Sequence, residues 1–436
     1  MTTCPDSNLN NRRWRASRLT VSVVVSLLLS AHSVHAAGDD DALSLESSAV
    51  AEEASASGAS KVYVEFALGH ADRRIPPPSQ TLSRASLDHY LTGRLAFGWK
   101  GVLSNRLDVL DPAEPGKDGV LNSLREAYAS WSDEAATWVA DVGRINTRLG
   151  SGYGYNPTDF FRDGSLRTFT TANPIALREN RMGSVVLRGQ RLWQRGSVSI
   201  AFSPKLANAP SGDAFSLDLG STNSRNRGML VLGLQPSERV SVQLALYKAD
   251  GLNPQPGVSL TALLSDAFVA HGEWSAAREP SLADYAWGVS GHSVTGQRFA
   301  GGLTFTSATK LSLTAEFQAN GFALSQAGWG AAAATNPALL DAYLREAQRR
   351  QDLPSRRAWL LYATQRDLGR KNLDVTTFVQ YNPDDDSRVA WLELRQRWTN
   401  TDLALQVQDN AGRSGTVYGI LPDRRSFHIL LARHFQ

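Results

Sequence analysis

The strongest constraint on the fold is a two-residue period of hydrophobicity that recurs along the chain. Between Lys310 and Ala319, five apolar residues alternate with five polar or charged ones. The segment therefore predicts a strand with one apolar and one polar face. Segments that begin near Arg239, Gln297 and Asp402 show the same alternation. No change of composition marks a second domain, and the turn signals between such segments predict an all-β fold of about 16–18 strands.

Short turns and long loops alternate between the expected strands. The strands are expected to begin near Lys61, Thr92, Asn105, Ser123, Thr137, Ser184, Ser197, Gly228, Arg239, Asp266, Leu282, Gln297, Lys310, Arg357, Leu373, Ser387, Asp402 and Ser426. The longest loops are expected at 145–183, 204–227, 249–265 and 320–356. Strands that cross an outer membrane have short periplasmic turns and long external loops. The sequence therefore predicts a single transmembrane antiparallel β-barrel over residues 61–436, closed because lipid does not tolerate unpaired strand edges.

The first 36 residues have the three parts of a secretory signal. Four arginines precede an apolar stretch, Leu19 to Ala31, and Val34 and Ala36 suit cleavage after Ala36. Residues 37–60 are small and acidic and are predicted to form a flexible periplasmic lead-in. Cleavage would leave 41 basic and 41 acidic side chains, so the formal charge of +3 belongs to the signal. A balanced mature chain predicts no nucleic-acid partner.

Patterns for a cofactor, a metal or catalysis are weak. The single cysteine, Cys4, lies in the predicted signal, and no two histidines have the spacing of a metal site. The glycine-rich stretch 150–154 lacks the helix and the Lys-Ser/Thr pair of a phosphate-binding loop. We therefore predict no cofactor, no metal, no catalytic residue and no enzymatic activity. His271 and His292 lie near expected outer strand ends, which leaves a barrel-embedded hydrolase as an alternative.

Charged residues on the polar strand faces are the candidate functional residues. A charge that faces lipid at the membrane midplane costs about 2–4 kcal/mol, so these side chains are assigned to the lumen. The predicted pore-lining residues are Arg188, Arg239, Arg298, Glu316, Glu393, Arg395 and Arg397, with Asp141 as a further acid. Arginine binds carboxylates through two hydrogen bonds. The residues predict a channel for small polar or anionic solutes, or an exporter of an acidic polysaccharide.

The expected loop 320–356 contains one amphipathic helix. Asn336 is a suitable N-cap, Pro337 suits the first helical position, and Pro354 ends the helix. One face carries Leu339, Leu340, Tyr343, Leu344 and Ala347, and the other carries Arg345, Glu346, Arg349 and Arg350. The helix could cap the barrel from outside, or it could pack on the inner wall near the outer mouth. In the inward arrangement, Arg345, Arg349 and Arg350 would form a constriction, and loop 320–356 is predicted to govern access.

The C-terminus and one internal region resemble known outer-membrane barrels. A last strand that finishes in Phe435 is similar to the assembly signal of bacterial outer-membrane barrels, although Gln436 follows it. The order of LREAY at 124–128, VGR at 142–144 and GSGYGYNPTD at 150–159 resembles porin-like barrels, including alginate-export-type proteins and related families. The resemblance covers only these short segments. It implies a barrel with a transport role in a Gram-negative outer membrane.

Residence in an outer membrane implies several partners. These are the membrane lipid and lipopolysaccharide, the barrel-assembly machinery, and the transported small solute or anionic polysaccharide. The sequence leaves the oligomeric state open. A structural or adhesive barrel that binds a partner through its external loops is a further alternative to a channel.

Overall fold

The computed structural model describes residues 59–113 and 118–435. The predicted signal peptide, 1–36, and most of the predicted lead-in lie outside the described residues. The strands are β1 Ala59–Arg73, β2 Ser79–Arg94, β3 Trp99–Asp111, β4 Val120–Ser132, β5 Trp138–Ile145, β6 Ser184–Trp193, β7 Gly196–Ser203, β8 Arg227–Ser237, β9 Val240–Ala249, β10 Gln255–Ser265, β11 Phe268–Glu279, β12 Val294–Thr306, β13 Leu311–Asn320, β14 Arg357–Gln365, β15 Leu373–Asn382, β16 Ser387–Arg397, β17 Thr401–Ala411 and β18 Asp423–Phe435. The α-helices are α2 Pro174–Glu179, α3 Leu219–Thr222, α4 Leu282–Trp287, α5 Gln326–Thr335 and α6 Pro337–Arg350. No helix in the described ranges combines the length and the apolar character needed to cross a membrane.

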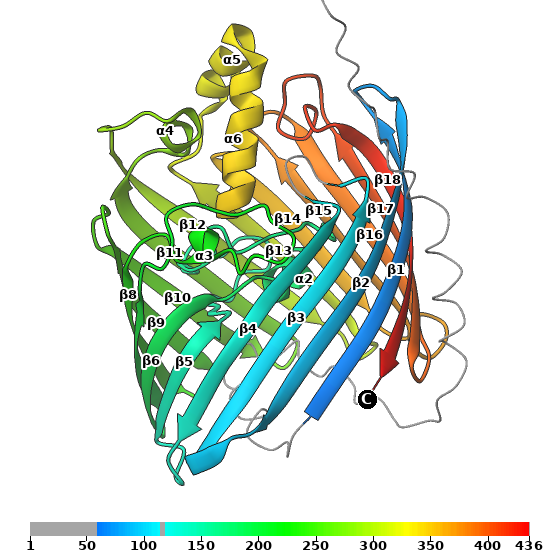
Figure 1. Ribbon diagram of the computed structural model, residues 1–436. Helices are drawn as coiled ribbons and strands as arrows, with labels where there is room; N and C mark the ends of the chain where they lie inside the picture. The colour runs from blue at the N-terminus through cyan, green and yellow to red at the C-terminus, as the bar shows by residue number, and fades with distance from the viewer. Residues whose placement is uncertain (1–58, 114–117, 436) are drawn as a thin grey trace, which may run out of the picture. The chain divides into compact units, whose positions relative to one another are not determined.

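The strands form one closed, tilted barrel (Figure 1). Each strand pairs antiparallel with the next along the chain, and β1 pairs with β18, with Val62 opposite Phe435. Closure leaves no strand edge unpaired, as crossing a membrane requires. The structure confirms the single antiparallel barrel, with a strand number at the upper end of the expected range.

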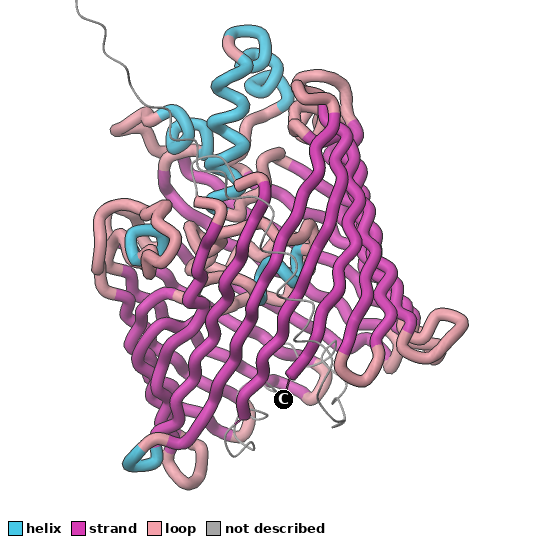
Figure 2. The backbone as a smooth tube through the Cα atoms, turned by 45° about the vertical axis from the view of Figure 1, so that its right-hand side comes forward, coloured by secondary structure: helices cyan, strands magenta, loops and turns pink. Residues whose placement is uncertain are grey.

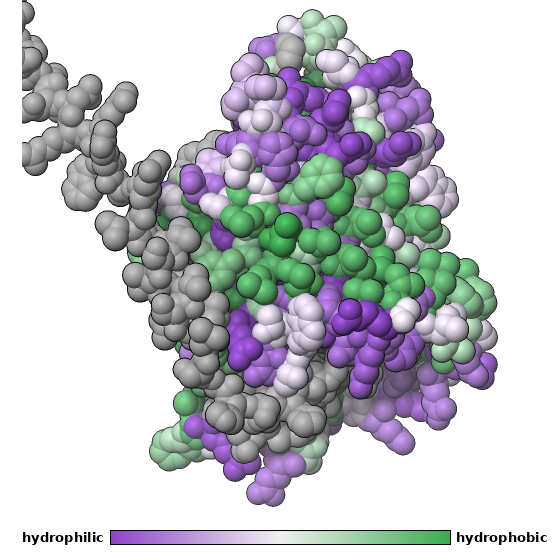
Figure 3. Space-filling view, turned by 90° about the vertical axis from the view of Figure 1, so that its right-hand side faces the viewer, coloured by the Kyte–Doolittle hydropathy of each residue, from purple (hydrophilic) through white to green (hydrophobic). Residues whose placement is uncertain are grey.

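The barrel has an apolar outer surface and a polar inner surface, the reverse of a water-soluble protein. Along β13, Thr314, Glu316 and Gln318 point inward and are at most 1% exposed, whereas Leu313 points outward and is 37% exposed. Figure 3 shows the resulting apolar belt between polar regions above and below it. A belt of this kind matches the hydrocarbon core of a membrane. The protein is therefore a barrel of the outer membrane.

The two ends of the barrel differ in the length of their connections. Short turns such as 194–195 and 266–267 gather at one end, together with the C-terminal end of β18 (Figures 1 and 2). The long loops 146–183, 204–226 and 321–356 all lie at the other end. Short turns face the periplasm in outer-membrane barrels, so the long loops form the external end.

The strand expected near Leu282 is wrong, because this segment is helix α4. Ser281 and Asp284 form a capping box, in which each side chain accepts a hydrogen bond from the other residue's backbone N–H. Gly288 then ends the helix in the left-handed conformation, with a φ of 69°. These capping residues favour a helix, whereas the strand was expected only from the regular spacing of the neighbouring strands.

The loop expected at 249–265 is also wrong, because it contains β10. Pro256 and Gly257 indicate a turn by composition, yet Pro256 is paired with Leu246 of β9 in the sheet. The strand expected near Thr92 begins at Ser79 instead, as β2. Its outward face is only weakly apolar, so its alternation is faint in the sequence.

An arginine on the outer belt should destabilise the barrel. Ile200 lies on the outward face of β7 and is 65% exposed. For Ile200→Arg we expect a loss of about 2–4 kcal/mol, depending on membrane depth, because a charge then faces lipid. The measurement is the midpoint of urea unfolding in lipid vesicles. Ser197→Arg is the control, since Ser197 lines the lumen and should leave the midpoint nearly unchanged. Equal losses in both variants would contradict the assigned faces.

Candidate functional site: the inward loop and the pore lining

The loop between β5 and β6, residues 146–183, folds into the barrel. Its helix α2 lies inside the barrel wall (Figures 1 and 2). Tyr155, Asn156, Thr158 and Asp159 of this loop are all buried. A buried loop needs partners for its backbone N–H and C=O groups. The inner wall supplies several of them, so we call residues 146–183 the inward loop.

Glu273 on β11 is the first anchor of the inward loop. Its carboxylate accepts hydrogen bonds from the Gly152 backbone N–H at 2.6 Å, from Thr158 Oγ1 at 2.7 Å and from Asn156 Nδ2 at 3.0 Å. A Cβ at Gly150, which has a φ of +90°, would collide with this carboxylate. The glycine-rich stretch thus allows the backbone to approach a buried acid closely.

Glu316 on β13 is the second anchor. It accepts hydrogen bonds from the backbone N–H groups of Tyr153 at 2.7 Å and Gly154 at 3.1 Å. His271 Nε2 lies 2.9 Å from the same carboxylate, and Gln318 Nε2 donates to it at 2.7 Å. Glu316 therefore points inward as the sequence predicts, but the inward loop covers it completely.

An apolar patch on the inner wall also holds the inward loop. Tyr362, Phe378 and Trp391, on β14 to β16, form a buried cluster against which Tyr153 and Ile175 pack. The ring centroids of Tyr153 and Tyr362 are 5.6 Å apart. Because this contact covers one side of the barrel, the lumen is narrowed on the side of β14 to β16.

A ladder of ion pairs lines the inner face of β1 to β4, and the sequence analysis missed it. The ladder consists of Glu65, Arg84, Asp88, Arg106, Asp108 and Arg125. Two of its members also contact the inward loop: Arg84 donates to the Thr170 carbonyl, and Arg125 donates to Asn180 Oδ1, both at 2.8 Å. The sequence did contain a signal for this ladder, because each of several neighbouring strands carries a charged residue on its inward face.

A cavity of about 870 Å³ with a mixed polar and apolar lining remains between the inward loop and the periplasmic turns. Hydroxyl and amide side chains supply much of its lining, and its charged residues are Lys100, Asp141, Arg188, Glu238 and Arg239. Arg188 Nε lies 2.8 Å from Asp141 Oδ2. Arg239, at the turn between β8 and β9, has no ion-pair partner among the described residues. The predicted pore-lining residues Arg188 and Arg239 therefore lie on this cavity.

Three further predicted pore-lining residues are paired along β16. Arg395 Nε lies 2.8 Å from Glu393 Oε1, and Arg395 Nη1 lies 3.6 Å from Asp402 Oδ2. Arg397 Nη1 lies 2.5 Å from Asp374 Oδ2. These side chains belong to the inner face, but neighbouring carboxylates neutralise the two arginines.

Arg298 belongs to a buried cluster at the outer end of the barrel. It contacts Glu279 at 2.7 Å and Asp352 at 2.9 Å, and Arg162 of the inward loop contacts Asp352 at 3.1 Å. Tyr155 OH donates to Asp352 at 2.5 Å. Burial would raise the pKa of Asp352, but the guanidinium groups of Arg298 and Arg162 outweigh it and lower that pKa to about 2. The cluster joins the inward loop to the segment after α6.

The sequence left two arrangements open for helix α6, and the structure has the outer one: the helix stands above the barrel (Figure 1) and does not pack on the inner wall. The helix begins after the Asn336 N-cap, as predicted. Its apolar face, with Leu340 and Tyr343, packs against Trp329 of α5, Leu282 of α4 and Val417. Helices α4 and α5 therefore supply the apolar surface that, in the inward arrangement, the inner barrel wall would have supplied.

The three arginines of α6 lie in different surroundings. Arg345 is exposed and pairs with Asp341 on the same helix. Arg349 Nη1 lies 2.7 Å from Asp163 Oδ1 of the inward loop, and Arg350 Nη1 lies 3.6 Å from its Oδ2. Arg349 and Arg350 therefore reach the mouth of the barrel, whereas Arg345 does not.

The two histidines considered for catalysis contact carboxylates. His271 contacts Glu316, and His292 lies 2.8 Å from Asp284. Neither histidine is hydrogen-bonded to a serine hydroxyl in the described part of the chain. No group of three His, Cys, Asp or Glu side chains in the same ranges has the arrangement of a metal site.

No protein-family model and no curated protein sequence matches this chain. Its fold is similar to that of solved bacterial structures. Acinetobacter baumannii OccAB1 is 10% identical with a TM-score of 0.57, and the match covers 87% of this chain and 96% of that one. A BenF-like porin from Pseudomonas fluorescens Pf-5 is 8% identical with a TM-score of 0.57, covering 87% and 98%. Pseudomonas aeruginosa OccK8 (OprE) is 13% identical with a TM-score of 0.51, covering 87% and 98%. The chain therefore has the fold of Gram-negative outer-membrane porins.

Proposed function

We propose that the protein is a channel through which small polar or anionic solutes diffuse across the outer membrane. The observation that carries this proposal is a lumen cavity with charged, hydroxyl and amide side chains in its lining, next to a loop that buried carboxylates hold inside the barrel. Charged, hydroxyl and amide side chains on the inner face of a barrel suit small hydrophilic solutes. An exported polysaccharide needs a wide passage along the whole barrel, and the narrowing by the inward loop argues against that alternative.

The charges of the cavity favour anions slightly. Its lining carries three cationic side chains, Lys100, Arg188 and Arg239, and two carboxylates, Asp141 and Glu238. In this proposal the inward loop forms the constriction, and Arg349 and Arg350 act at the outer mouth. Cleavage after Ala36, lipopolysaccharide contact and insertion by the barrel-assembly machinery remain predictions from the sequence.

Planar-bilayer recording tests the proposal. The purified barrel should produce discrete conductance steps, and a potassium chloride gradient should give a reversal potential with a modest anion preference. Arg239→Gln should shift that potential toward cations, because it removes a cavity charge that has no partner in the described residues. Arg345→Gln, on the exposed side of α6, is the matched control and should leave it unchanged. A folded, inserted barrel that conducts no ions would contradict the proposal.

A further inference from the structure

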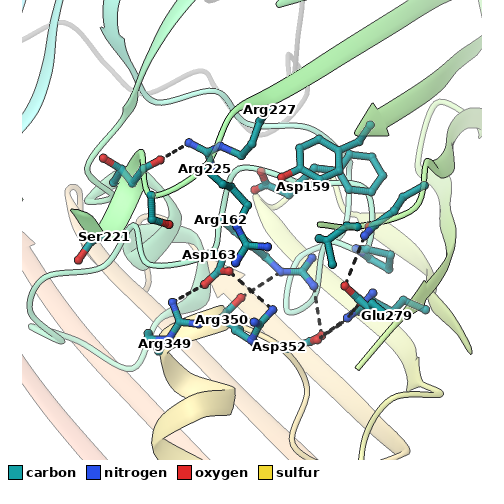
Figure 4. A pocket seen from close by; sticks show the side chains of 18 residues that line it. Asp159, Arg162, Asp163, Ser221, Arg225, Arg227, Glu279, Arg349, Arg350 and Asp352 are labelled. Carbon is teal, nitrogen blue, oxygen red and sulfur yellow. Dashed lines mark hydrogen bonds and ion pairs between the residues drawn. The ribbon is translucent and has the colours of Figure 1, made fainter. Parts of the chain in front are cut away.

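A small polar pocket lies at the outer mouth, between the inward loop, the loop 204–226 and the end of α6 (Figure 4). Its volume is about 100 Å³, which leaves room for a small ligand or several waters. Its charged lining consists of six arginines and four carboxylates: Arg162, Arg225, Arg227, Arg298, Arg349, Arg350, Asp159, Asp163, Glu279 and Asp352. We call it the mouth pocket.

Two carboxylates of the mouth pocket already have two arginine partners each. Asp352 contacts Arg162 and Arg298 at 3.1 and 2.9 Å. Asp163 contacts Arg349 and, at the longer distance of 3.6 Å, Arg350. Neither carboxylate is in direct contact with a further arginine of the pocket.

The other two carboxylates are also engaged. Glu279 lies 2.7 Å from Arg298. Asp159 pairs with Arg181 and, at 3.5 Å, with Arg178, neither of which lines the pocket. The Oδ1 atom of Asp159 is buried and has no hydrogen-bond partner. No carboxylate of the pocket thus remains for Arg225 or Arg227.

Arg227, at the start of β8, is only 6% exposed. One of its terminal nitrogens donates to the Thr222 carbonyl, to Ser184 Oγ at 2.8 Å and to Ser203 Oγ at 3.2 Å, and its guanidinium lies over the Phe161 ring. These neighbours are neutral, and its buried Nε has no hydrogen-bond partner. A buried guanidinium without a counter-charge is costly. Arg227 therefore lines the pocket while none of its direct contacts is with a carboxylate.

Arg225, two residues earlier, is half-buried on the pocket lining. No carboxylate among the described residues lies within ion-pair distance of it. Burial would raise the pKa of Asp163, but the charges of Arg350, Arg349, Arg225 and Arg227 outweigh burial and lower it. Of these four arginines, only Arg349 and Arg350 contact Asp163 directly.

We propose that the mouth pocket binds a small oxyanion, a carboxylate or phosphate group, through Arg225 and Arg227. Arginine matches such groups because its planar fork donates two parallel hydrogen bonds. The lining side chains belong to the inner face and the folded loops, so the anion comes from solution and not from the lipid outside the wall. Binding here goes beyond the proposed channel function, because a site at the mouth does not require passage through the barrel.

Isothermal titration of the purified protein in detergent tests this proposal. Sodium phosphate and sodium acetate are titrated separately at constant chloride. At least one of them should bind saturably, at about one anion per chain, and the two arms show which group is preferred. Arg225→Gln should weaken binding about tenfold or more, because hydrogen bonds to a charged group are lost. Arg345→Gln should bind like the original protein.

Two outcomes would overturn the oxyanion site: no saturable binding of either anion, or equal affinity in Arg225→Gln and the original protein. Arg225 is half-buried, so its replacement should still fold, and heat-modifiable gel mobility checks this directly. Arg227→Gln is a second variant with the same expected loss. Because the titration needs no membrane, binding without conductance contradicts only the channel. Conductance without binding contradicts only this site.

Discussion

Replacing residues 148–181 with a short glycine–serine linker should raise the single-channel conductance severalfold. The inward loop occupies the lumen, and an 18-stranded barrel without such a filling is wide enough to hold an aqueous channel. The linker can close the gap because Ile145 and Ser184 are paired in the sheet. Single-channel recording in planar bilayers measures the change, and gel mobility with and without heating shows that the barrel still folds.

A matched replacement of residues 326–350 separates the two loops that could control access. This change removes α5 and α6, and a short linker can again close the gap because Leu324 and Ser355 form a bridge. We expect a much smaller rise in conductance, since the apolar face of α6 packs on other external segments. A rise equal to that of the first variant would show that loop 320–356 governs access, as the sequence analysis predicts.

Asp352→Asn should lower the stability of the barrel by about 3–5 kcal/mol, because it leaves Arg162 and Arg298 buried without this counter-charge. The Asp352 side chain is 3% exposed, and it joins the inward loop, β12 and the segment after α6. Glu279 still pairs with Arg298, so we expect the lower end of that range. Urea unfolding in detergent gives the free-energy difference.

Asp341→Asn is the control for Asp352→Asn. Asp341 and Arg345 form an ion pair on the solvent side of α6, with side chains 62% and 65% exposed. An exposed pair contributes about 0–1 kcal/mol, because water and salt screen it. If both variants lost the same stability, the buried cluster would not be what holds the external end together.

The contribution of Asp352 should also depend on pH in a defined direction. Its pKa is about 2 in the folded protein and 3.8 in an ordinary aspartate. A lowered folded-state pKa contributes stability that is complete above the unfolded value and is lost as the pH falls through the folded value. The difference between the original protein and Asp352→Asn should therefore be largest above about pH 4 and shrink toward pH 2.

The sequence by itself determined the barrel and the direction of its side chains. A period of two assigns each side chain to one face, and in β13 it correctly separates Leu313 from Glu316. The same local reasoning identified α6, because the N-cap Asn336 and the following Pro337 stand at the start of the helix itself. Local patterns suffice here because strand faces and helix caps depend on residues close together in the chain.

Only the tertiary structure decided which loop enters the lumen and which charges remain free. Gly152 is held by Glu273, more than a hundred residues later, and no periodicity links the two. In the same way, Arg397 and Arg239 have the same chemistry in the sequence, but Asp374 neutralises only Arg397. Such pairings depend on the register of neighbouring strands and on contacts across the lumen. A channel's lining is therefore a long-range property, whereas the wall that carries it is encoded locally.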